Sequence, residues 1–146
     1  MKKLALTFLS FIVLLCLLSC ELEFSNNGKL DGYWKLRSID SLSTGKTADY
    51  TDSTYFWSVQ YDLLQVTNAA TNEKIVFRFK DTKDLLSINT PYISNREEGD
   101  IVVDNPMILH PYGIQDLTEN FLKVTLKSGK MVLESNNGFR LHFQKF

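Results

Sequence analysis

Cysteine is scarce in this 146-residue sequence, and its placement limits what it can do. The two cysteines, Cys16 and Cys20, lie in the N-terminal apolar region, and none follows them. A disulfide framework, a cysteine metal site and thiol catalysis are therefore not expected in the rest of the chain. A domain of this size can bury more than half of its unfolded surface, so it can fold without such links.

The sequence also lacks an excess of charge of either sign, with 16 Lys and Arg against 17 Asp and Glu. Nucleic-acid binding requires a concentrated basic surface. We therefore expect no nucleic-acid partner.

Motifs of metal and enzyme chemistry are missing as well. His110 and His142 are the only histidines, and neither has a second histidine or a carboxylate at metal-ligand spacing. The acidic run at 97–100 could hold calcium, but it lacks the ligand spacing of a calcium loop and favours a solvated turn. No nucleophile elbow, phosphate loop or dinucleotide fingerprint occurs. We predict no metal, no cofactor and no enzymatic activity. A hydrolase that uses paired carboxylates is a distant alternative.

What is present begins with an export signal over residues 1–19. Lys2 and Lys3 precede the uncharged, mostly apolar run 4–18, which as a helix would rise about 22 Å against about 30 Å of bilayer hydrocarbon. This run is short for a permanent span and well sized for a cleavable signal. The segment Leu17-Leu18-Ser19-Cys20 resembles the lipobox of bacterial lipoproteins, which implies cleavage before Cys20 and lipid on its sulfur. The alternatives are an ordinary secretory signal with an incidental cysteine and a retained anchor helix.

The predicted organisation follows from that signal. Residues 20–29 are polar and contain Asn26-Asn27-Gly28, which predicts a lipidated, flexible tether, and residues 30–146 form one domain. Acyl chains would hold the protein to a membrane. We expect it in the cell envelope, lipid-anchored to the outer membrane, with the periplasmic or surface face left open.

From Leu30 onward the apolar residues alternate as they do in β-strands. The alternation predicts strands at 32–40, 74–80, 84–89 and 100–103. The long run 55–67 changes phase near Tyr61-Asp62, which predicts a bulge or, as an alternative, a turn between two strands. The best helical candidate is Gly113–Asn120.

Three later groups of side chains are each predicted to share one face of a strand: Leu122, Val124 and Leu126; Met131 and Leu133; and Phe139, Leu141 and Phe143. Ser128-Gly129-Lys130 and Asn136-Asn137-Gly138 are typical of hairpin turns. About eight short antiparallel strands predict an all-β barrel or sandwich.

Several of these residues together resemble a known family. Gly32-Tyr33-Trp34 resembles the lipocalin G-x-W signature, and the likeness continues through Tyr55–Val66 and Arg140–Phe143. Most of 30–146 looks like the lipocalin-like (calycin-type) domain of Bacteroidetes lipoproteins. This resemblance implies an up-and-down antiparallel β-barrel in which Trp34 plugs the closed end and Arg140 packs across its ring. One departure is that the chain ends at Phe146, on the last strand, without the helix that usually follows the barrel.

The irregular segment 89–120 is the main candidate for function because long connections in compact domains are often functional. It could be a flap whose Tyr92, Arg96 and Tyr112 contact a ligand or a partner. The favoured alternative is a covering loop that packs Met107, Ile108 and Leu109 over one open end.

Two functions remain open at this stage. The first is binding of a small apolar or amphipathic ligand in an internal pocket lined by aromatic side chains. The second is a non-enzymatic structural or protein-interaction role with a filled barrel, because an eight-stranded barrel can be filled by its own side chains. The sequence indicates no particular protein partner.

Overall fold

The computed structural model describes residues 25–146, so the signal segment and Cys20 lie outside the described residues. Ten strands and two short 3-10 helices follow in order: η1 Gly28–Leu30, β1 Gly32–Ser41, β2 Thr47–Asp49, β3 Tyr55–Gln60, β4 Leu63–Asn68, β5 Glu73–Asp81, β6 Leu85–Ile93, β7 Ile101–Val102, η2 Pro106–Tyr112, β8 Glu119–Leu126, β9 Lys130–Ser135 and β10 Phe139–Lys145.

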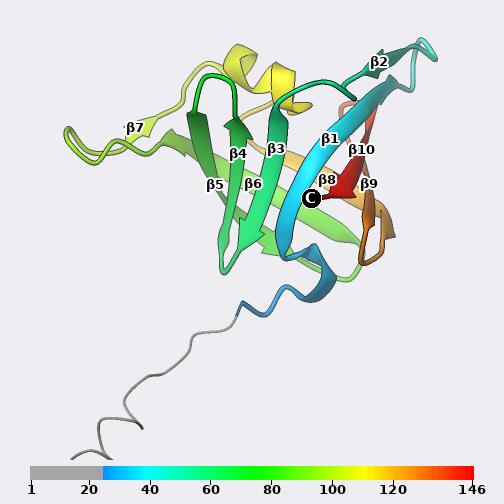
Figure 1. Ribbon diagram of the computed structural model, residues 1–146, viewed down its shortest axis with the longest axis horizontal. Coiled ribbons are helices and arrows are strands. Elements are labelled where there is room, and N and C mark those ends of the chain that lie inside the picture. The colour runs from blue at the N-terminus through cyan, green and yellow to red at the C-terminus, as the bar shows by residue number, and fades with distance from the viewer. Residues whose placement is uncertain (1–24) are drawn as a thin grey trace, which may run out of the picture.

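Eight of these strands close into an antiparallel barrel, in the order β1-β3-β4-β5-β6-β8-β9-β10, with β10 pairing back onto β1 (Figure 1). β2 and β7 are short additions that pair with β1 and β6. The predicted all-β, up-and-down barrel of about eight strands is confirmed. Closure satisfies the backbone hydrogen bonds of strands that an open sheet would leave exposed at its edges.

The barrel has two unlike ends. At the entry end, where the chain comes in through η1, the strands are joined by short turns at 61–62, 82–84 and 127–129. The far end carries the β1–β2 turn, the long β6–β8 connection with η2, and the β9–β10 turn (Figure 1). The two ends are called the entry end and the far end below.

Side chains of the barrel's own strands fill its interior. Trp57 is fully buried, and its ring lies 5.4 Å from that of Phe121 and 5.0 Å from that of Phe143, centroid to centroid. One continuous cluster contains the other large buried residues, among them Trp34, Leu36, Leu64, Ile75, Phe77, Leu86, Ile88, Met131, Leu133 and Leu141. The barrel axis is therefore occupied by packed side chains, where one of the two hypotheses expected a pocket lined by aromatic residues.

Trp34 closes the entry end, but its partner differs from the predicted one. Its indole nitrogen donates a hydrogen bond to the Leu30 carbonyl at 2.9 Å, and the Lys145 ammonium lies 4.9 Å from its ring centroid. Lys145 pairs in register with Trp34, whereas Arg140 pairs with Asp40 toward the far end of β1. The predicted Trp34–Arg140 pair is therefore wrong. Gly32, at φ 127°, lies beneath the Lys145 side chain, where an added Cβ would come within 2.5 Å of Lys145 Cε.

Three local predictions are also corrected. The phase change at Tyr61-Asp62 is a two-residue turn between β3 and β4 and not a bulge. On β8, Leu122 and Val124 share a face as predicted, but this face is the outward one, where they are 45% and 47% exposed; Leu126 packs against the core, and Phe121 is buried. The segment Gly113–Asn120 is not helical, because the 3-10 helix ends just before it at Tyr112.

Candidate functional site

The long connection between β6 and β8 forms a cap over the far end. Asn105 caps the start of η2, where its side chain accepts a hydrogen bond from the Met107 amide at 3.0 Å, and Gly113 caps the end in the left-handed conformation, φ 84°. A Cβ on Gly113 would come within 2.5 Å of Leu141 Cδ2 and 3.2 Å of Ile39 Cδ1. Glycine therefore lets the cap sit directly on β1 and β10.

Tyr112 anchors this cap in the core. Its carbonyl accepts a hydrogen bond from the Trp57 indole nitrogen at 3.0 Å, and its hydroxyl donates to Glu73 Oε2 at 3.3 Å. Burial, followed by the nearby Glu73 carboxylate, raises the pKa of Tyr112 above its usual range. Leu109 is fully buried and Ile108 packs against the core, whereas Met107 is 65% exposed. The predicted covering loop is confirmed for two of its three apolar residues.

A buried carboxylate holds the chain that leaves the cap. Glu119 is fully buried and accepts hydrogen bonds from the amides of Gln115, at 2.6 Å, and Asp116, at 3.3 Å. The Ser135 hydroxyl donates to its other oxygen. These donors replace water around the charge, so Glu119 fixes segment 115–119 against β9.

Beside the cap lies a groove of about 500 Å³, open at the far end of the barrel. Its floor and walls include four apolar side chains, Ile39, Ala48, Tyr50 and Phe139. Its polar lining comes from Ser41, Thr44, Lys46, Thr47, His110 and Gln115. The groove therefore combines an apolar surface with a polar rim.

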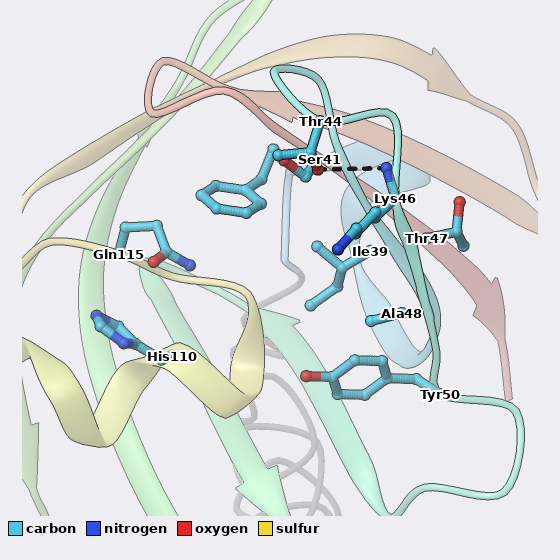
Figure 2. A pocket seen from close by; sticks show the side chains of 10 residues that line it. Ile39, Ser41, Thr44, Lys46, Thr47, Ala48, Tyr50, His110 and Gln115 are labelled. Carbon is cyan, nitrogen blue, oxygen red and sulfur yellow. Dashed lines mark hydrogen bonds between the residues drawn. The ribbon is translucent and has the colours of Figure 1, made fainter.

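Two sides of the molecule face each other across this groove. Figure 2 shows Lys46 and Tyr50 reaching inward from the β1–β2 side toward His110 and Gln115, which come from the cap and the segment after it. A backbone hydrogen bond from the Ser41 amide to the Lys46 carbonyl, 2.8 Å, closes the β1–β2 turn. Burial raises the pKa of Tyr50, with a further contribution from Tyr55, so Tyr50 presents a neutral hydroxyl.

The charged group in the lining of the groove is positive. Lys46 supplies an ammonium group, and none of the described residues that line the groove is acidic. The nearby Asp40 points to the outer wall, where it accepts hydrogen bonds from Thr47 Oγ1 at 2.7 Å and pairs with His142 Nε2 at 2.8 Å. These two contacts, that of Thr47 first, hold the pKa of Asp40 below its usual value. The arrangement suits a molecule with an apolar body and an acidic or polar head.

The three residues predicted to contact a ligand do not line this groove. Tyr112 belongs to the core, Tyr92 pairs with Val76 and Val102 within the sheet, and Arg96 is exposed beside a separate hollow that Gln65 and Lys74 also line. Their contact with a ligand or partner stays a prediction. Sequence reasoning missed the groove, because segment 41–50 is polar, has few apolar residues and contains no motif.

Within residues 25–146, no group of three or more His, Cys, Asp or Glu side chains is placed to hold a metal ion. The predicted acidic turn at 97–100 is exposed. Over the same residues, no helix has the length and apolar character needed to cross a bilayer.

Comparison with known proteins agrees with the barrel geometry. A family model described as a lipocalin-like domain matches residues 13–146. A lipocalin-like protein from Bacteroides uniformis is 19% identical, with a TM-score of 0.60 over 82% of this chain and 100% of the other. A protein from Bacteroides eggerthii is 21% identical, with a TM-score of 0.59 over 80% and 99%. A protein from Burkholderia xenovorans is 12% identical, with a TM-score of 0.54 over 88% and 93%. At these identities the structural likeness shows the fold alone. No curated protein matches the chain.

Proposed function

The chain belongs to the lipocalin-like domain family, and from this premise we propose that it is a lipid-anchored envelope protein that binds a small amphipathic molecule in the far-end groove. The binding is non-enzymatic. The observation that carries the proposal is a groove with apolar walls, one lysine and no acidic residue among its lining.

The size of the groove supports binding of a small ligand. Ligand sites usually have volumes of about 300–1,000 Å³, with mostly apolar walls and a few placed polar groups. The groove has about 500 Å³ and the same mixture of surfaces. Since the barrel core is packed, a ligand would lie against Ile39 and Tyr50 at the mouth and not on the barrel axis. Lys46 would then meet the acidic or polar head.

The anchor is proposed from the sequence. Leu17-Leu18-Ser19-Cys20 resembles a lipobox, and lipid on Cys20 would give durable attachment because several acyl chains would enter the bilayer. The outer membrane is the proposed location. Intact-mass spectrometry of the processed protein tests this part directly, since an unmodified N-terminus would refute it.

Two probes that differ mainly by one charge test the groove. 1-Anilinonaphthalene-8-sulfonate is an amphipathic anion, and N-phenyl-1-naphthylamine is a neutral molecule of similar shape. We expect both to bind the purified protein with enhanced fluorescence. Phe139→Ala should weaken both probes, because Phe139 forms part of the apolar wall. Lys46→Met should weaken the anion by about two- to five-fold, as expected for an exposed ion pair, and leave the neutral probe unchanged.

The control is Lys80→Met, which removes an exposed lysine of β5 that does not line the groove. It should leave both affinities unchanged. Equal losses for Lys46→Met and Lys80→Met, or equal losses for the two probes, would contradict a specific role for Lys46. Mass spectrometry of small molecules released from the natively purified protein then identifies the physiological class of ligand.

The packed core also favours the second candidate, a protein-interaction role. Leu85 and Leu122 are paired across β6 and β8, and with Val124 they form an apolar strip, each residue 43–47% exposed. Leu122→Lys should then remove a partner recovered by crosslinking in envelopes without changing probe binding. An unchanged crosslinking pattern would exclude this strip as the contact.

A further inference from the structure

The composition of segment 20–29 predicts a flexible tether, but hydrogen bonds attach the chain to the barrel from Ser25 onward. Ser25 Oγ accepts a hydrogen bond from the Tyr61 amide at 2.8 Å, and the Asn27 side chain donates to the Tyr61 carbonyl at 2.7 Å. Asp31 accepts from the Ser25 hydroxyl at 2.5 Å and from the Asn27 amide at 3.1 Å. The chain is thus fixed to the entry end from Ser25 onward.

This attachment shortens the connection to the proposed anchor. Only four residues, 21–24, separate Ser25 from Cys20, which would carry the lipid, and the five Cα–Cα steps between them span at most about 18 Å. An anchored protein therefore keeps its entry end close to the bilayer surface. The groove is lined by residues around β2 and η2, which Figure 1 shows at the opposite end of the barrel, so it would face away from such a membrane.

The two ends also differ in charge, because exposed lysines gather at the entry end and acidic residues at the far end. Four exposed lysines surround the entry end: Lys29, Lys83, Lys127 and Lys130. None of them forms an ion pair with another residue in the range 25–146. Of the acidic residues at this end, Asp62 is paired with Arg78, Asp81 is paired with Lys123 and Asp31 is hydrogen-bonded, which leaves Asp84 and the carboxylate of Phe146.

The far-end loops are acidic. Their basic residues are Lys46 and Arg96, with Lys74 at the start of β5, against Asp49, Asp52, Glu97, Glu98, Asp100, Asp104 and Asp116. An anionic surface would therefore attract the entry end and repel the far end.

Exposed aromatic rings accompany the entry-end lysines. Phe146 is 82% exposed, and its ring lies edge-on to those of Tyr33 and Phe56, at 6.0 and 5.6 Å. Tyr61, at the tip of the β3–β4 turn, is 45% exposed. Aromatic side chains flanked by lysines are typical of surfaces that rest in the headgroup region of a bilayer.

From this juxtaposition we propose that the entry end is a membrane-docking surface that rests on anionic phospholipid headgroups, with the groove held outward. The inference rests on the proposed lipid anchor. The anchor supplies attachment, and the lysines and aromatic rings supply orientation.

The test uses the full lipidated protein on vesicles, with one fluorophore per variant. Cys20 is the sole cysteine expected in the processed chain and its sulfur would carry lipid, so an introduced cysteine is the single labelling site. Ser128→Cys places the label in the β8–β9 turn of the entry end, and Ala70→Cys places it in the β4–β5 turn of the far end. The vesicles contain headgroup-nitroxide quencher in either phosphatidylcholine alone or phosphatidylcholine with 30% phosphatidylglycerol.

Flotation of the protein with phosphatidylcholine vesicles reports the anchor. On the anionic vesicles we expect the label at 128 to be quenched at least three-fold more than the label at 70. The difference should decline in 0.5 M NaCl, which screens the charges. Lys127→Glu with Lys130→Glu should abolish it, while Lys74→Glu with Arg96→Glu at the far end, an equal change of net charge, should preserve it.

Each failure has a separate meaning. Absence of flotation on neutral vesicles refutes the lipid anchor, and it also refutes the docking surface, because the docking surface depends on the anchor. Flotation with equal quenching at 128 and 70 on anionic vesicles overturns the docking surface and leaves the anchor intact. A difference that the two double variants reduce equally would also overturn it.

Discussion

The two ends of the barrel differ in how they connect the same strands. At the entry end, short turns join the strands and Trp34 seals the core beneath Lys145. At the far end, long connections replace the turns, and a capped groove forms where Tyr50 and His110 face each other. The comparison shows that strand side chains can fill the core while the connections of one end form a groove.

The largest expected effect comes from removing the tryptophan of the entry end. Trp34 is fully buried and makes a hydrogen bond to the Leu30 carbonyl. Trp34→Ala should lower the free energy of unfolding by about 3–5 kcal/mol, because it leaves a large cavity. Urea unfolding measures this, with Met107→Ala as the far-end control, which should change little because Met107 is 65% exposed. A loss below about 1 kcal/mol for Trp34→Ala would show that the entry end is not tightly packed.

A smaller loss is expected when the far-end carboxylate is removed. Glu119→Ala leaves the amides of Gln115 and Asp116 and the buried hydroxyl of Ser135 without this acceptor, so stability should fall by about 1–3 kcal/mol. Hydrogen exchange should accelerate in segment 113–118 before the entry-end strands, and probe affinity should drop. The matched control, Glu134→Ala, removes a partly exposed pair with Arg140 and should cost less than about 1 kcal/mol. Faster exchange throughout the barrel would contradict a local role for Glu119.

The lysine over Trp34 should contribute less again. Lys145→Met should lower stability by about 0.5–1 kcal/mol, the usual contribution of a cation–π contact whose cation keeps contact with water, and shift the tryptophan emission. Arg140→Met should leave that emission unchanged, because Arg140 pairs with Glu134 near the other end. If the arginine variant alone shifted the emission, the register of β1 and β10 would be in error.

The smallest effect is a change in pH dependence on the outer wall of the far end. Folding lowers the pKa of Asp40 from its ordinary 3.8, chiefly through the hydrogen bond from Thr47. The ionised carboxylate therefore stabilises the fold above about pH 4, and this contribution is lost as the pH falls through the lowered pKa. Thr47→Val should raise the pKa of Asp40 toward its ordinary value, as followed by NMR titration of its carboxyl carbon. An unchanged titration midpoint would exclude the Thr47 contact as the cause.

The sequence predicts the barrel well because its signals are local. The buried pairs Ile75 and Phe77, Met131 and Leu133, and Leu141 and Phe143 follow from the period of two in a strand, and the turn before β10 is made by Gly138 at φ 83°. The sequence favours a bulge over the β3–β4 turn because Tyr61, which adopts φ 55° in that turn, is neither glycine nor asparagine. The face of β8 is misassigned because Leu122 and Val124 imitate a core face while Lys123, nearly buried, pairs with Asp81.

The candidate site could not be predicted because it depends on long-range placement. The β1–β2 turn and η2 are about sixty residues apart, and only barrel closure brings Lys46 opposite His110. The partner of Trp34 likewise depends on the register of β10, which is fixed by strand pairing and not by the type of residue. Lysine and arginine both carry a cation, so sequence alone could not choose between Lys145 and Arg140.

Hydrogen–deuterium exchange on the lipidated protein, bound to anionic vesicles, tests the division between the two ends most directly when it is measured with and without 1-anilinonaphthalene-8-sulfonate. Vesicle binding should slow exchange in the turns at 61–62 and 127–130. Adding the probe should slow exchange at 41–50 and 110–115 and leave the entry-end turns unchanged. Probe protection at the entry end, or vesicle protection at 41–50, would contradict the account.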